Sequence, residues 1–135
     1  MTRFDASDPQ SRRSLYVDAI AAHRDRGSQF VTIEVDENAT AENPEAADLG
    51  VPWLQFAEGI VNLDCTGDEL ERLKSLLSEF PAFSIDELTR PEDAEGVNVR
   101  VSATADSDRI AQFLDRVIRI VYAFPETTRV WVVEL

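Results

Sequence analysis

Few side chains in this sequence have both the type and the spacing that catalysis requires. His23 and Cys65 are the only histidine and the only cysteine, and a thiolate nucleophile needs a base close to it. Nothing local brings the two together, because His23 falls near a helix end and Cys65 ends an apolar run. We expect Cys65 to be a small buried hydrophobe and His23 to be a surface imidazole. The sequence therefore predicts no catalytic residue.

The sequence also lacks the common motifs for phosphate loops and metal sites. The five glycines follow neither of the two phosphate-loop spacings, and the sequence contains no C-x-x-C or H-E-x-x-H. The acidic stretch from Asp36 to Asp48 lacks the alternating oxygen ligands and the central glycine of a calcium loop. We therefore expect neither a metal site nor a cofactor.

A pocket between a loop and a sheet is the remaining place for small-molecule chemistry. Trp53 ends the acidic loop, and Asp64 and Arg100 fall on predicted strands. An indole, a carboxylate and a guanidinium in one place could line a site for an anionic ligand. The alternative is that Trp53 and Trp131 are core or interface anchors, which is where large aromatic side chains usually lie.

The net charge of the chain indicates the kind of environment it suits and the kinds of partner it can bind. Asp and Glu number 26 against 13 Lys and Arg, which gives a net charge of −13, and Lys74 is the only lysine. Self-repulsion of this size destabilises a compact chain, and salt screens it. The composition resembles that of proteins from halophilic archaea. It argues against a nucleic-acid partner, and we expect most arginines to pair with carboxylates rather than to bind an anion.

Hydrophobic periodicity predicts the helices and strands. We expect a helix from Pro9 to Arg26, capped by Asp8, and then a strand over 29–35. One strand over 54–65, with a bulge or a close approach at Gly59, should precede a helix that opens with the capping box Thr66 to Glu69. The rest should be strands over 83–88 and 97–103, a helix capped by Asp106, and a closing strand over 129–135.

This order predicts a single α+β domain over residues 1–135. Residues 54–135 read as β-α-β-β-α-β, a ferredoxin-like antiparallel sheet with helices on one face. Residues 8–53 add an N-terminal helix, a strand and the acidic loop, and residues 1–7 should be frayed. We expect the added strand to pair at an edge of the sheet.

The closing strand is apolar on both sides, so something must cover its second face. The N-terminal helix and a second copy of the protein are both candidates, and the expected interface residues are Trp131, Val133 and Leu135. No apolar run is long enough to span a membrane, and the lone cysteine and the polar N-terminus favour the cytoplasm. The sequence thus favours a non-catalytic, salt-adapted, homo-oligomeric interaction or assembly module. The alternative is a ligand-binding or weakly enzymatic domain around Trp53, Asp64 and Arg100.

Overall fold

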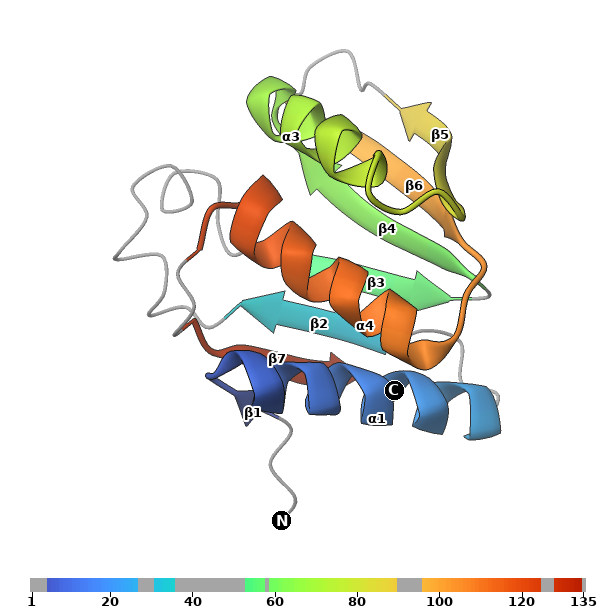
Figure 1. The fold of residues 1–135 in the computed structure, drawn as a ribbon, viewed down its shortest axis with the longest axis vertical. Helices are drawn as coiled ribbons and strands as arrows, with labels where there is room; N and C mark the ends of the chain where they lie inside the picture. Colours follow the sequence, from blue (N-terminus) through green and yellow to red (C-terminus); the bar gives the residue numbers. More distant parts are fainter. Residues whose placement is uncertain are drawn as a thin grey trace.

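A seven-stranded antiparallel sheet carries the helices of this protein on one of its faces (Figure 1). The structure is a computed structural model, and it describes residues 5–26, 31–35, 53–57, 59–89, 96–124 and 128–134. The strands are β1 (Asp5–Ala6), β2 (Val31–Val35), β3 (Trp53–Ala57), β4 (Ile60–Cys65), β5 (Phe83–Thr89), β6 (Val97–Ala103) and β7 (Val130–Glu134). The helices are α1 (Pro9–Arg26), α3 (Gly67–Leu77) and α4 (Ser107–Arg116), which continues as the π-helix η2 (Val117–Val121).

Local signals placed the helix starts correctly. The capping box that opens α3 is confirmed: the Glu69 N–H donates to Thr66 Oγ1 at 3.3 Å, and the Thr66 N–H donates to Glu69 Oε1 at 2.8 Å. Asp106 caps α4 by accepting the Arg109 N–H at 2.9 Å. The bounds predicted for α1 and β6 are also confirmed.

Residues 54–65 form a hairpin of two strands instead of the single strand that the sequence predicted. Gly59 lies at the turn with a φ of +79°, a left-handed backbone conformation that glycine adopts without steric cost. On either side of it, Ala57 pairs with Ile60 and Leu54 pairs with Leu63. The glycine therefore reverses the chain, whereas a bulge would only have bent it.

This extra strand changes the topology of the sheet. The order is β1-β7-β2-β3-β4-β6-β5, whereas a ferredoxin-like sheet would place β7 directly beside β4. The strands β2 and β3 occupy that position, so the ferredoxin-like order is not confirmed, although the α+β class with an antiparallel sheet is. The prediction of an edge position for β2 was wrong, because β2 lies between β7 and β3.

The core lies between the sheet and the helix layer. Each inner strand alternates, so that every second residue is buried beneath the helices, as in Val31, Ile33 and Val35 of β2. At the other end of the sheet, the rings of Phe80, Phe83 and Phe113 pack with centroids 5.0 to 5.4 Å apart. The remaining half of each strand must therefore face the opposite side of the sheet.

The C-terminal end of η2 has a strained backbone. The Tyr122 N–H donates to the Val117 carbonyl at 3.0 Å, and the Phe124 N–H donates to the Ile118 carbonyl at 3.2 Å. Between them, Ala123 has a φ of 60°, in the left-handed region. Helices commonly end with such a residue, but it is usually glycine.

Candidate binding surface on the open face of the sheet

All the described helices lie on one face of the sheet (Figure 1). The N-terminal helix therefore covers only one of the two faces of the closing strand β7. The ring of His23 on α1 packs edge-on against Phe56 of β3 at 5.7 Å, and α1 lies beside α4 in the same layer (Figure 1). The first helix therefore covers the side of the sheet that α3 and α4 also cover. We call the other side the open face, and its described residues include Thr32, Glu34, Trp53, Gln55, Ala57, Ile60, Asn62, Asp64, Ser84, Glu87, Asn98, Arg100, Ser102 and Trp131.

A carboxylate lies between two tryptophans on the open face. The strand register pairs Glu34 of β2 with Trp131 of β7 on one side and with Trp53 of β3 on the other. Residues directly opposite one another in antiparallel strands have Cβ atoms about 4.5–5.5 Å apart. Both indoles are only half-buried. The row from Trp131 through Glu34 to Trp53 thus presents a large, partly apolar area on a sheet surface.

A polar cluster lies beside this row, on β4 and β6. The side-chain amide of Asn98 donates to Asn62 Oδ1 at 2.8 Å and to Asp64 Oδ1 at 3.0 Å. Arg100 is exposed, and the register places it between Asn62 and Glu87. Within the part of the chain that the structure describes, its guanidinium makes no hydrogen bond or ion pair. Arg100 therefore presents a positive charge to solvent.

The structure brings the three residues of the predicted ligand site to one face. Trp53, Asp64 and Arg100 lie on the neighbouring strands β3, β4 and β6, and all three belong to the open face. The surface that they share is a sheet face, and the acidic loop expected to close it lies outside the described residues. Of the expected interface residues, Trp131 lies on the open face, whereas Leu135 and the side chain of Val133 lie outside the described residues.

The histidine and the cysteine occupy separate buried places. His23 is 5% exposed, so the expectation of a surface imidazole was wrong. Cys65 is buried at the end of β4, and burial raises its pKa from 9.0 to about 12. Because the thiolate is the nucleophilic form of cysteine, this protonated thiol is not suited to nucleophilic attack at neutral pH.

Charged residues of the first and last helices, which the sequence analysis expected mostly to pair with carboxylates, converge on the helix side. Arg12 and Asp115 form a buried ion pair, and Arg13, Arg109 and Arg116 line a hollow next to it. Arginines on the first and last helices were visible in the sequence. Their convergence depends on how α1 packs against α4, and no local spacing reports that packing.

In residues 5–134, as far as they are described, no three His, Cys, Asp or Glu side chains form a group that could hold a metal ion. None of the described helices combines the length and the apolar character needed to cross a bilayer. Comparison with curated proteins gave no match, and comparison with solved structures gave none. Over residues 1–135 the chain matches, and therefore belongs to, the family described as Family of unknown function (DUF7975).

Proposed function

We propose that this protein is a non-catalytic interaction module of a salt-rich cytoplasm that forms a homo-oligomer through the open face of its sheet. The row Trp131–Glu34–Trp53 carries the proposal. Tryptophan is enriched among the residues that dominate binding energy at protein interfaces. Here two of them lie half-buried on a face that no described helix covers.

The size of the open face matches what a stable dimer buries. Without the two-residue β1, six strands at about 4.8 Å each give the sheet a width of about 29 Å. Strands of five to seven residues give it a length of about 17–24 Å, at about 3.4 Å per residue. Two such faces would bury about 1,000–1,400 Å² together, which reaches the lower range of specific interfaces.

One pair of opposite charges on the open face, Glu34 and Arg100, suits a second copy as the occupant. Without the two-residue β1, the strands β2 and β6 are each second from an edge of the sheet. A two-fold axis parallel to the strands, running between two stacked sheets over the boundary of β3 and β4, exchanges β2 with β6. This arrangement brings Arg100 of each copy near Glu34 of the other. Such an isologous interface would place two opposite-charge pairs on either side of a centre that contains Trp53 of each copy, with Trp131 on β7 toward the edge.

The mass of the protein in solution tests this proposal. We expect light scattering in about 1 M KCl, where charge repulsion is screened, to give a clean multiple of 15.1 kDa. Trp131→Ala should lower the mass toward 15.1 kDa while the circular dichroism spectrum keeps its native shape. The matched control is Ile120→Ala, because Ile120 is a large hydrophobic residue, 38% exposed, on the helix side. A monomeric wild-type protein, or a mass that responds to Ile120→Ala instead, would contradict the proposal.

A small anionic ligand at Trp53, Asp64 and Arg100 is the second candidate function. Its support is the guanidinium of Arg100, which is exposed beside the ordered amides and carboxylate of Asn62, Asn98 and Asp64. If this candidate is right, an anionic metabolite raises the melting temperature and Arg100→Ala abolishes that rise, while the protein stays monomeric. A metabolite screen without a single hit would count against it.

A further inference from the structure

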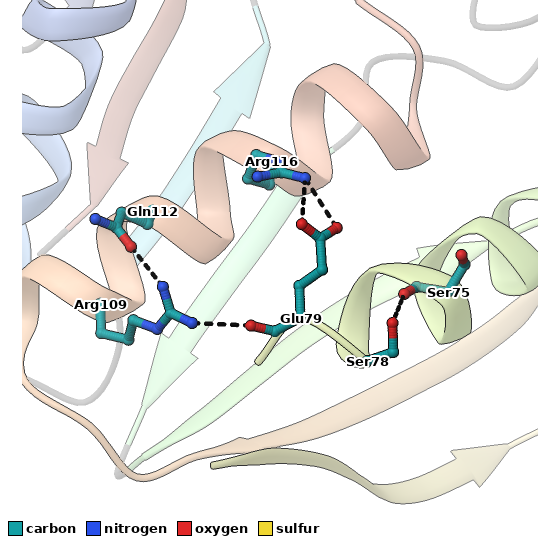
Figure 2. Close-up of polar contacts among 6 residues, drawn as sticks. All are labelled: Ser75, Ser78, Glu79, Arg109, Gln112 and Arg116. Carbon is teal, nitrogen blue, oxygen red and sulfur yellow. Dashed lines mark hydrogen bonds and ion pairs between the residues drawn. The ribbon is translucent and has the colours of Figure 1, made fainter. Parts of the chain in front are cut away.

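A hollow of about 360 Å³ lies on the helix side of the molecule, on the opposite side of the sheet from the open face. Its walls come from α1, from α4 and from the turn that follows α3, and they consist of Arg13, Glu79, Phe80, Arg109, Gln112, Asp115 and Arg116. Figure 2 shows that Arg109 and Arg116 extend from α4 toward Glu79. Three arginines thus line one hollow in a chain whose net charge is −13.

Arg109 is held in place before any ligand arrives. Its guanidinium carbon lies 4.1 Å from the centroid of the Phe80 ring. Nη1 donates to Gln112 Oε1 at 2.7 Å, and Nη2 donates to the Glu79 carbonyl at 2.9 Å (Figure 2). A side chain fixed in this way loses little conformational freedom on binding, which favours affinity.

The carboxylates in the walls do not cancel the positive charge. Asp115 Oδ1 accepts from Arg12 Nε at 2.7 Å, so a fully buried arginine behind the wall neutralises Asp115. This leaves Glu79 as the other wall carboxylate. It accepts from Arg116 Nη2 at 2.9 and 3.1 Å. Three arginines against one remaining carboxylate give the hollow a local charge of +2.

Arg13 completes the cluster from the first helix. It is exposed, and within the described ranges it makes no hydrogen bond or ion pair. Arg116 likewise reaches Glu79 through one nitrogen, so the other N–H groups of its guanidinium point to no described partner. The planar guanidinium group of arginine matches the oxygens of a phosphate group in geometry and charge. A phosphate monoester carries a charge of about −1.5 to −2 at pH 7.

From these contacts we propose that the hollow binds a ligand through a phosphate group, held by Arg13, Arg109 and Arg116. The inference is independent of the proposed self-association, because the hollow and the open face lie on opposite sides of the sheet. Glu79 competes with the ligand for Arg116. The site is therefore expected to bind more tightly when that carboxylate loses its charge.

Titration of the purified protein with inorganic phosphate tests the site. We expect calorimetry or ³¹P NMR in about 1 M KCl to show saturable binding with a Kd of about 1 mM, the weak end for specific recognition. Arg13→Ala should raise the Kd about tenfold, corresponding to the loss of one charge-assisted contact. Glu79→Gln, which keeps a hydrogen-bond acceptor but loses the charge, should lower the Kd several-fold. Acetate at the same concentration should compete weakly.

Lys74→Ala is the matched control, because Lys74 is an exposed cation on the helix side, outside the hollow, and its ion pair with Glu71 is also exposed. It should leave phosphate binding unchanged. Equal weakening by Arg13→Ala and Lys74→Ala would show a non-specific charge effect and overturn the site. Weakening by Arg100→Ala alone would move the anion site to the open face. No saturation by about 50 mM phosphate, with the melting curve native, would also overturn it.

Discussion

Arg12 and Asp115 form a buried ion pair that joins the first helix of the chain to the last. Arg12 Nε lies 2.7 Å from Asp115 Oδ1, and the side chain of Arg12 is 0% exposed. Its Nη1 donates to the Thr128 carbonyl at 2.9 Å, and the Tyr16 hydroxyl donates to Asp115 Oδ1 at 3.3 Å. The pair therefore ties α1 both to α4 and to the segment that leads into β7.

Removal of one member of this pair should destabilise the protein strongly. Asp115→Ala removes the carboxylate that faces the buried guanidinium of Arg12, and breaking a buried ion pair typically costs about 3–5 kcal/mol of unfolding free energy. Urea denaturation in about 1 M KCl measures the loss. Glu79→Ala is the control, since it breaks the exposed pair with Arg116 and should cost less than about 1 kcal/mol. A loss below about 1 kcal/mol for Asp115→Ala would mean that the pair does not hold the helices together.

Alkaline pH should destabilise the fold through Cys65. Its pKa is raised from 9.0 to about 12 by burial, with smaller contributions from Glu69 and Asp64. The folded state keeps a proton that the unfolded chain releases. The contribution of Cys65 to the free energy of unfolding is therefore fully present below pH 9 and is lost as the pH rises from 9 to 12. Burial raises the pKa values of Tyr16 and Tyr122 as well, which extends the loss in the same direction.

Urea unfolding at pH 7, 9, 10 and 11 measures this dependence. Cys65→Ala removes the thiol, so the variant should lose less stability than the wild type between pH 9 and pH 10, whatever its stability at pH 7. In the native protein at pH 8.5, iodoacetamide should react with Cys65 slowly, and unfolding should make the reaction fast. Parallel pH curves for the two proteins, or rapid alkylation of the native state, would refute the assignment.

Relief of backbone strain at Ala123 should stabilise the protein. Its φ of 60° costs an L-residue about 1–2 kcal/mol. Glycine avoids that cost but adds about 0.4–1 kcal/mol of unfolded-state entropy. Ala123→Gly should therefore raise the unfolding free energy by about 0.5–1 kcal/mol and the Tm by a few degrees. In the control, Ala21→Gly on the exposed side of α1, the Tm should fall, and a similar fall for Ala123→Gly would contradict the prediction.

A charge exchange should reveal the pairing that the proposed dimer requires. Arg100→Glu and Glu34→Arg should each reduce the oligomer mass, because each places like charges opposite one another. The double variant should recover the mass, since every pair is again of opposite sign. Arg13→Glu, on the helix side, serves as the charge-matched control and should leave the mass unchanged. A double variant that is folded but still monomeric would argue against this geometry.

Elements with strong local signals could be predicted from the sequence. The start of α1 follows from Asp8, whose Oδ1 accepts the Ser11 N–H at 2.9 Å, and from Pro9 at the first helical position. The alternation in β6 also fixed its two faces, so Arg100 was correctly expected to point away from the helices. The same alternation places Trp53 and Asp64 on the open face, once their strands are known.

Features that depend on chain reversal or distant packing could not be predicted. The apolar alternation continues through both strands of the β3–β4 hairpin, so a single Gly59 looked like a bulge, and the strand order was lost with it. Arg12 and Asp115 are 103 residues apart in the sequence. His23 looked exposed at a charged helix end, but the packing of α1 on the sheet places its ring against Phe56.

The position of β7 has a consequence for synthesis on the ribosome. β7 is made after the other described strands, yet it lies between β1 and β2 in the sheet. A nascent chain that ends before residue 130 leaves the outer edge of β2 without its partner, and such an edge can pair with other chains. Neither can Asp5 find its partner Trp131 until then. β1 and β2 can therefore join one sheet through β7 only after translation of residues 130–134, and before then the net negative charge of the chain opposes association with its neighbours.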